Sequence, residues 1–411
     1  MRTCSKALPG RHRQGGVNLI EVMVGLVIGL VASLVVMRSF SASEAFRRNV
    51  NGSADATQMT ALVGVRLNML IEDAGAGLVQ GRHVWGCRVL ATRNGAALLP
   101  VAGLPEPFLR FPGTVRVLPV GILDGGEAAA DILMVISAGS SSGNRDIPFD
   151  SNGQVLTVSN PNGVGLLKPA ERVDDLFLAV PQEVAGAPSD CQIVQAAPGA
   201  GGGAPIMDAT LGLRVMPSMA QSASAATYTT IPLNMASTSY GALALSGGAS
   251  SVFHLGREAA PVFSLISVNA HAELVEHDLL QRRNLQSFGE NIVLLKARYG
   301  LDNGNGGSAN DNVIDQWVSP GEAGWTLAEL MNGEEATEQK IDQIKAIRIG
   351  MVVRSAQVPD ADARVPRITL FDDLPGTGRV VRELAADQQR HRYQAFDWVI
   401  PLRNMKSIPK S

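Results

Sequence analysis

The stretch Gly16-Val17-Asn18-Leu19-Ile20-Glu21, followed by the apolar run Val22–Met37, decides the architecture of this chain. From Val17 to Met37 there are 21 residues, which as an α-helix would measure about 30 Å and cross a hydrocarbon core. Its one charged side chain is Glu21. A carboxylate at the centre of a membrane helix costs on the order of 2.5–3.5 kcal/mol, and less near an end. The stretch therefore predicts a membrane anchor whose single acid serves a further purpose.

Residues 1–16, which precede the anchor, are short and basic. They carry Arg2, Lys6, Arg11 and Arg13, no acidic residue and no apolar run of their own, so they do not form an ordinary secretory signal. Positive charge before a membrane helix keeps the N-terminus in the cytoplasm. The rest of the chain is therefore predicted to be exported.

The composition of the chain excludes a basic nucleic-acid footprint. The 411 residues carry a formal net charge of −3, with 35 Lys and Arg against 38 Asp and Glu. The leader holds four of the basic residues, which leaves 31 against 38 in the remainder. A nucleic-acid-binding surface needs an excess of Lys and Arg, and the body is mildly acidic.

Helix is predicted to continue beyond the membrane, because no proline occurs between Pro9 and Pro100. A break is expected at Asn49–Ser53, which contains Gly52. An amphipathic helix follows, with Arg66, Asn68 and Glu72 on its polar face and an end at Gly75 and Gly77. Its predicted apolar face consists of Met59, Leu62, Val63, Leu67, Leu70, Ile71 and Ala74.

From Val84 onward, short apolar runs bounded by turn residues predict strands. The expected strands are Val84–Leu90, Thr114–Val120, Asp131–Ile136, Gln154–Val158, Leu176–Val180, Ser251–Leu255, Val262–Asn269, Asn291–Gly300, Ala346–Val353 and Tyr393–Pro401. Short helices are expected at Glu322–Leu330 and Thr337–Ile344, and a loop-rich insertion at about 195–250. A helix followed by many strands predicts an α+β fold, with the amphipathic helix covering a mainly antiparallel sheet.

Cys87 and Cys191 are the two cysteines of the predicted exported body, while Cys4 lies in the leader. Two cysteines in an exported domain indicate one disulfide. The alternative is two unpaired buried thiols.

The segment around Asp302 has two interpretations. Asp302, Asn303, Asn305, Asp311 and Asp315 crowd oxygen ligands of the kind that Ca²⁺ prefers into one turn. Gly304 stands where the EF-hand pattern has Asp or Asn, however, and no glutamate closes the loop. A turn between two strands is therefore favoured over a metal site, and no cofactor is predicted.

Catalytic motifs are absent from the sequence. The six histidines are scattered, and they form no His-Glu-x-x-His pattern. His271 and His277 stand near Glu273, Glu276 and Asp278, and His277 beside Asp278 is more simply a solvated turn. Ser140–Ser142 lacks the nucleophile-elbow pattern. The body is therefore predicted not to be an enzyme.

The stretch from Gly16 to Val24 resembles the class III signal of type IV prepilins. The resemblance implies that prepilin peptidase cuts between Gly16 and Val17, that the new amine of Val17 is N-methylated, and that Glu21 is the assembly glutamate. It further implies that Glu21 pairs with the Val17 amine of a neighbouring subunit. Val17 departs from the usual phenylalanine of the family, and Asn18 from the usual threonine or serine.

Segments of the body resemble PilW-like minor pilins. They are Arg66–Gly75, Trp85-Gly86-Cys87, Ser189-Asp190-Cys191, Asn291–Asp302, Ala346–Ser355 and Pro401-Leu402-Arg403-Asn404. The resemblance implies a lollipop-shaped pilin with a leader at 1–16, a membrane and assembly half-helix at 17–38, an amphipathic helix at 39–79 and a periplasmic β-rich body at 80–411.

As a pilin of this kind, the chain would take part in pilus initiation and in the tip complex. It would sit in the inner membrane with one pass and a periplasmic body, and then at the pilus tip. Its partners would be prepilin peptidase, other minor pilins, the major pilin and a tip adhesin. Two alternatives stay open: a large minor pseudopilin of a type II secretion system, and a membrane-anchored periplasmic hydrolase.

Overall fold

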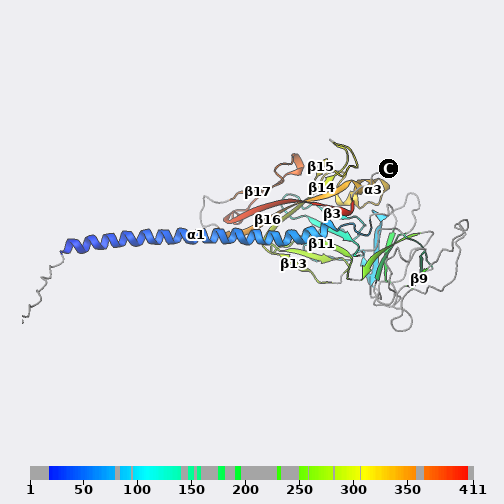
Figure 1. Ribbon diagram of the computed structural model, residues 1–411, viewed down its shortest axis with the longest axis horizontal. Coiled ribbons are helices and arrows are strands. Elements are labelled where there is room, and N and C mark those ends of the chain that lie inside the picture. Colours follow the sequence, from blue (N-terminus) through cyan, green and yellow to red (C-terminus); the bar gives the residue numbers. More distant parts are fainter. Residues whose placement is uncertain are drawn as a thin grey trace, which may run out of the picture. The chain divides into compact units, whose positions relative to one another are not determined.

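The computed structural model forms two compact units, Met1–Ala54 and Asp55–Ser411, and each is described by itself (Figure 1). It describes residues 18–78, 84–93, 96–139, 147–151, 155–158, 175–180, 190–195, 229–232, 250–257, 259–280, 283–305, 307–357 and 365–405. The predicted α+β class is confirmed: an N-terminal apolar helix is followed by several mainly antiparallel sheets. The lollipop arrangement of the two units stays a prediction.

Helix α1 runs without interruption from Leu19 to Glu72. Within it, Leu19–Ser41 has a mean hydropathy of 2.7 and is long and apolar enough to cross a membrane. The predicted break at Asn49–Ser53 is wrong, because this segment is helical. A glycine inside a helix costs only about 1 kcal/mol relative to alanine, and only proline removes a helix hydrogen bond.

The part of α1 that belongs to the second unit packs into the main hydrophobic core. Val63, Leu67 and Ile71 are fully buried there, as the amphipathic pattern predicts. Leu62 was predicted on the same face and is exposed. One residue corresponds to about 100° of rotation in a helix with 3.6 residues per turn, which carries Leu62 away from the buried face.

In the part of the second unit that the structure describes, the strands form three sheets and one hairpin, where the sequence predicted a single sheet. The eight-stranded sheet has the order β2-β1-β8-β7-β10-β5-β6-β9 and is antiparallel except for the β1–β8 pair. Its strands are β1 (Arg88–Arg93), β2 (Ala96–Leu99), β5 (Ile147–Ser151), β6 (Val155–Val158), β7 (Asp175–Val180), β8 (Asp190–Gln195), β9 (Thr229–Pro232) and β10 (Ser250–Arg257).

The other two sheets and the hairpin are entirely antiparallel. The five-stranded sheet, β13-β12-β11-β4-β3, consists of β3 (Val120–Leu123), β4 (Ile132–Ser137), β11 (Val262–Val268), β12 (Leu274–Asp278) and β13 (Gln286–Gly289). The four-stranded sheet, β15-β14-β16-β19, consists of β14 (Ile292–Leu301), β15 (Gln316–Val318), β16 (Ile344–Gln357) and β19 (His391–Pro401). The hairpin pairs β17 (Arg367–Leu370) with β18 (Val380–Glu383).

The four-stranded sheet is covered on both faces. Leu295 and Ile347 belong to the main core with α1, whereas Leu294 and Val352 pack with Ile368 of the β17–β18 hairpin in a second, smaller core. Since both faces are buried, β14 shows no alternation of polar and apolar residues. Its central position puts even charged side chains out of contact with water.

Two short helices connect β15 to β16: α2 (Leu327–Leu330) and α3 (Glu335–Gln343). Among the described residues, 3₁₀ turns lie at Phe108–Arg110, Gly376–Gly378, Gln388–Arg390 and Arg403–Met405. Helix α2 begins later than the predicted Glu322, because Thr326 and Glu329 form a capping box. That arrangement satisfies the first free N–H groups of the helix and fixes its start.

Two predicted strands differ from the structure in a way that has a local cause. The expected strand Val84–Leu90 begins only at Arg88, since Gly86 has a positive φ of 79° in a turn. The expected strand Thr114–Val120 is replaced by irregular pairing, in which Val117 donates to the carbonyl of Cys87. Of the predicted insertion at about 195–250, β9 and the first residue of β10 are described, and the remainder lies outside the described residues.

Candidate functional site

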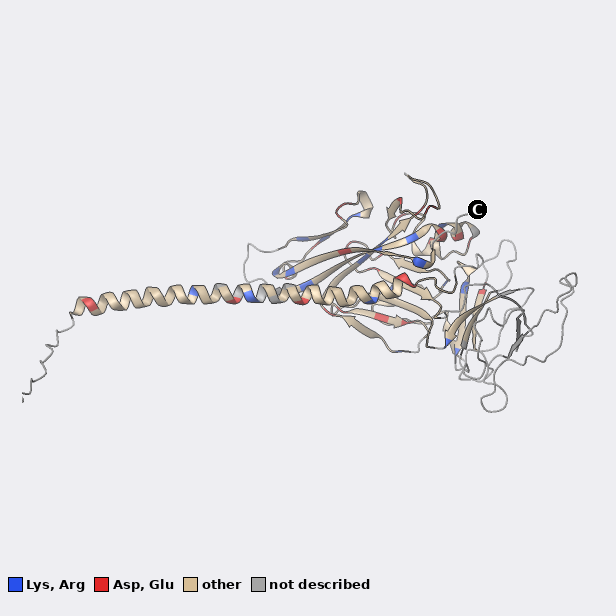
Figure 2. Ribbon diagram, viewed as in Figure 1, with Lys and Arg blue, Asp and Glu red and all other residues tan. Residues whose placement is uncertain are grey.

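Glu21 stands in the first turn of α1, which begins at Leu19. Its backbone N–H donates to the carbonyl of Asn18 at 2.9 Å. A negative charge at a helix N-terminus is favoured by the helix dipole, so the fold accepts the carboxylate here. Figure 2 shows this acidic start of α1, followed by a long stretch without charge. Gly16 and Val17 lie outside the described residues, so the cleavage site stays a prediction.

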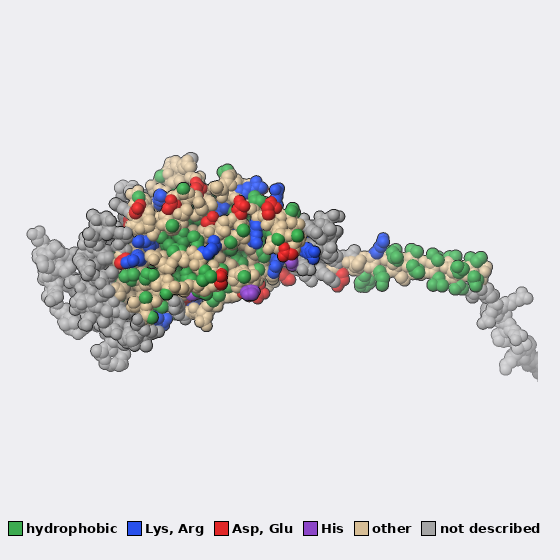
Figure 3. Space-filling view, turned by 180° about the vertical axis from the view of Figure 1, so that it is seen from behind, with side chains coloured by type: hydrophobic (Ala, Val, Ile, Leu, Met, Phe, Trp, Pro, Cys, Tyr) green, Lys and Arg blue, Asp and Glu red, His purple; other side chains and the backbone are tan. Residues whose placement is uncertain are grey.

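Apolar side chains line the face of the N-terminal part of α1 that Figure 3 shows, and exposed apolar side chains recur along Leu19–Met37. Leu19, Leu26 and Met37, for example, are all largely exposed. A helix that is apolar all round needs lipid or other helices around it. Gly25 and Gly29 leave open space where a Cβ would stand, which is the surface that a second helix needs for close approach.

A second apolar surface lies on the part of α1 within the second unit. Leu62, Val65 and Met69 are 62%, 62% and 58% exposed. Their spacing of three and four residues puts them on one side of the helix. We call these three side chains the outer stripe. They lie on the side of α1 that the core does not use, so the helix presents an apolar surface outward as well as inward.

Two ionic contacts hold this part of α1 to the body. Arg66 pairs with Glu276 of β12 at 3.0 Å, and the other oxygen of Glu276 accepts a hydrogen bond from the Ser264 hydroxyl at 2.7 Å. At the end of the helix, Arg403 pairs with the Glu72 carboxylate at 2.8 Å. Both pairs fix the rotation of α1, and hence the direction in which the outer stripe faces.

The C-terminal segment also satisfies the free carbonyls at the end of α1. The side-chain amide of Asn404 donates to the carbonyl oxygens of Glu72 and Ala74, each at 3.4 Å. The last carbonyls of a helix have no partner within it, so Asn404 supplies one from far along the chain. The sequence singled out Leu402-Arg403-Asn404 only by resemblance, and no periodicity indicates that this segment caps α1.

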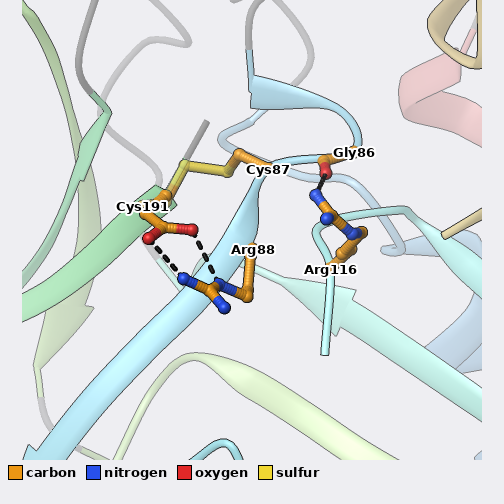
Figure 4. Close-up of a disulfide and its surroundings, with 6 residues drawn as sticks. Gly86, Cys87, Arg88, Arg116 and Cys191 are labelled. Carbon is orange, nitrogen blue, oxygen red and sulfur yellow. Dashed lines mark hydrogen bonds and ion pairs between the residues drawn. A yellow bond between two sulfur atoms is a disulfide. The ribbon is translucent and has the colours of Figure 1, made fainter. Parts of the chain in front are cut away.

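Cys87 and Cys191 form the predicted disulfide, and their Cα atoms are 5.8 Å apart (Figure 4). Next to it, Arg88 makes a bidentate ion pair with Asp190. The Nε atom of Arg88 is 2.7 Å from Oδ1 of Asp190, and Nη2 is 2.6 Å from Oδ2. The hydrogen bond to Asp190 raises the pKa of Arg88. These contacts lie at the parallel β1–β8 pair, where Arg88 is opposite Asp190. The ion pair therefore joins β1 to β8, and the disulfide joins β8 to Cys87, the residue directly before β1.

Arg116 completes this cluster from the segment before β3. Its guanidinium donates to the Gly86 carbonyl at 2.6 Å (Figure 4). Burial, followed by repulsion from Arg88, lowers the pKa of Arg116. The cluster is thus a structural clamp, with each polar group bound to a protein partner.

In the segment around Asp302, the carboxylates bind backbone N–H groups. Asp302 accepts from Asn310 at 2.6 Å and from Asn312 at 2.7 Å, and Asp315 accepts from Asn303 at 3.0 Å. Asn305 and Asp311 stand in the same loop, where the N–H of Asn305 donates to the Asn303 side chain and Asp311 accepts from Val313. Asp302 and Asp315 thus hold the turn by hydrogen bonds.

No group of three or more His, Cys, Asp or Glu side chains with metal-binding geometry occurs in the part of the chain that the structure describes. His271 is exposed at a turn. His277 lies 5.9 Å from the ring of Phe108, and burial lowers its pKa. The predicted solvated turn at His277 and Asp278 is wrong, because both residues belong to strand β12 and Asp278 is buried. Ser140–Ser142 lies outside the described residues.

A comparison with protein families gives one result. Residues 267–404 match the family model PilW, described as Type IV Pilus-assembly protein W. This region extends from β11 to the segment after β19, and it includes the four-stranded sheet together with Arg403 and Asn404. No curated protein and no solved structure matches the chain.

Proposed function

We propose that this chain is a minor pilin of the type IV pilus, on the premise that residues 267–404 carry a type IV pilus-assembly protein W domain. In this proposal prepilin peptidase cuts between Gly16 and Val17, and the Val17 amine is methylated. The mature protein then joins other minor pilins in the complex that initiates the pilus and stays at its tip, in contact with the major pilin and an adhesin.

The observation that carries this proposal is the surface of α1. Its N-terminal part carries exposed apolar side chains along Leu19–Met37, and the outer stripe is a second exposed apolar surface on the part that packs against the body. Exposed apolar surfaces of this kind mark interaction sites. The domain that holds the end of α1 through Arg403 and Asn404 is the one that matches the pilus-assembly family.

The proposed mechanism is association of helices rather than catalysis. In the membrane the apolar part of α1 contacts lipid, and in the pilus it contacts the helices of other subunits. Glu21 pairs there with the Val17 amine of a neighbour, because a polar group buried among apolar helices needs a partner. The pilus-assembly match favours the pilus over a type II secretion pseudopilus, and the contacts of His271 and His277 do not favour the hydrolase.

Removal of the leader gives the first test. We expect intact-mass and N-terminal peptide analysis of the chain from its native host to show a methylated Val17 as the first residue. The family resemblance at Gly16 and Glu21 is the reason. A chain that keeps residues 1–16 in cells making pili contradicts the proposal.

The outer stripe gives a second test. In a strain from which the chain is deleted, we expect the wild type to restore surface pili and Val65→Glu to restore few or none. An exposed substitution changes folding stability by about 0.5 kcal/mol or less, so the loss would reflect an interface. Sheared-pilin assays and electron microscopy measure the result.

Thr57→Glu is the matched control, since Thr57 is exposed on the same helix and, at about 100° of rotation per residue, lies off the side that carries the outer stripe. It adds the same charge and should restore pili fully. Normal piliation with Val65→Glu contradicts a role for the outer stripe, and normal piliation after deletion of the chain contradicts the proposed function.

A further inference from the structure

A lysine and an aspartate are buried together between two sheets. Lys296 lies in the middle of β14, and Asp131 comes directly before β4. The Lys296 Nζ atom is 2.7 Å from Asp131 Oδ1, and the two side chains are 1% and 0% exposed. The pair thus connects the four-stranded sheet to the five-stranded sheet, away from water.

Asp131 is held in one orientation by two backbone donors. Its Oδ1 atom accepts from the N–H of Gly125 at 2.8 Å, and its Oδ2 atom accepts from the N–H of Ala297 at 2.9 Å. The backbone N–H of Asp131 donates to the Leu295 carbonyl at 2.9 Å. The carboxyl group is therefore held in one orientation, with Oδ1 against the Lys296 nitrogen and Cγ one bond beyond that oxygen.

A second carboxylate stands beside the lysine. Asp124 Oδ1 is 3.5 Å from Lys296 Nζ, and the Asp124 side chain is 34% exposed. Lys296 also donates to the carbonyl of Gly126. The amine thus has one buried carboxyl group as a partner and one partly solvated carboxylate that can exchange protons with water.

Burial makes the uncharged form of the pair accessible. Taking two charges out of water costs several kcal/mol per ion. Burial raises the pKa of Asp131, against the opposing effect of Lys296. Transfer of one proton from the ammonium to the carboxylate removes both charges and leaves an amine, which is a nucleophile, next to a carboxylic acid.

We propose that Lys296 and Asp131 condense to form an intramolecular amide crosslink. The Lys296 nitrogen attacks Cγ of Asp131, a C–N bond forms, and the Cγ–OH bond breaks. Asp124 accepts the proton that leaves the nitrogen and returns it to the departing hydroxyl group, which leaves as water. The N–H groups of Gly125 and Ala297 stabilise the negative charge that develops on the carboxyl oxygens. One water is released, and no oxidation or reduction occurs.

The crosslink would tie β14 to the beginning of β4. These strands belong to different sheets, so the bond would join the two sheets covalently at the main core. This modification is independent of the proposed function in the pilus and goes beyond it.

Intact mass spectrometry of the full chain, purified in detergent and with its disulfide reduced, tests the proposal. We expect a mass lower than that of the sequence, after correction for processing, by one water. Protease digestion should yield a branched peptide that joins the Lys296 segment to the Asp131 segment. The unmodified mass overturns the proposal. Loss of water confined to a linear peptide containing Asp131, which indicates a cyclic imide, also overturns it.

Two variants separate the chemistry from folding. Lys296→Arg keeps the positive charge but removes the primary amine, and we expect it to have the full mass. Asp124→Asn keeps the buried pair and removes the proton carrier, and we expect crosslinked molecules to fall to a minority. Water loss at Asp131 that persists in Lys296→Arg overturns the crosslink, and an unchanged crosslinked fraction in Asp124→Asn overturns the role of Asp124.

Discussion

Glu21→Ala is expected to remove the chain from pili while leaving it processed, folded and in the membrane. The substitution makes the anchor more apolar, so insertion does not suffer. It removes the acid that pairs with the Val17 amine of a neighbour. Two unit charges 4 Å apart interact by about 4 kcal/mol at an effective dielectric constant of 20, which corresponds to roughly a thousandfold in the assembly equilibrium.

The measurement is the amount of the chain in sheared pili against the amount in the inner membrane. Glu44→Ala is the matched control, because Glu44 is an exposed acid of the same helix beyond the apolar run. Glu21→Gln keeps the shape and removes the charge, and should fail like Glu21→Ala. Equal incorporation of Glu21→Ala and wild type would exclude the ion pair as the basis of assembly.

Replacing Cys87 and Cys191 by alanine together should lower the free energy of unfolding of the second unit by about 2–5 kcal/mol. The two cysteines are 104 residues apart, and the disulfide restricts the unfolded chain over that whole distance. The Arg88–Asp190 pair stays in the variant, but it is partly exposed, and an exposed ion pair contributes only about 0–1 kcal/mol. It therefore does not replace the covalent bond.

Urea unfolding of the purified chain measures this effect, because the midpoint shifts with stability when the slope is unchanged. Cys4→Ala is the control, since Cys4 lies in the predicted leader, and its midpoint should equal that of the wild type. Peptide mapping without reduction should show Cys87 joined to Cys191. Free thiols at both positions in the native protein would refute the disulfide.

Some features could be predicted from the sequence because they depend on local pattern. The apolar run Val22–Met37, the amphipathic spacing of Val63, Leu67 and Ile71, and the disulfide of an exported body needed no knowledge of distant contacts. The prediction of a break at Asn49–Ser53 was wrong. Weak helix formers such as Asn, Ser and Gly lower helix stability only slightly, and no proline interrupts this segment. The prediction that Leu62 is buried was wrong, because Leu62 and the buried Val63 are neighbours in sequence and so point about 100° apart around the helix.

Other features depend on tertiary contacts, and the sequence contains no local pattern that predicts them. Lys296 looks like an ordinary break in an apolar strand, and only the burial of both faces of β14 makes it a partner of Asp131. The three separate sheets follow from strand pairings across long distances, such as β1 with β8. The outer stripe is a matter of which helix face the core leaves uncovered, which the sequence alone does not decide.

The cap that Asn404 places on α1 has a consequence for the order in which the molecule is completed. The two residues of the Asn404–Glu72 contact are 332 positions apart, and a chain is synthesised from its N-terminus. The apolar part of α1 is therefore synthesised long before Asn404, the residue that caps the far end of the helix. A chain whose synthesis stops anywhere between Glu72 and Asn404 would therefore contain the whole of α1 but lack the side chain that caps its end.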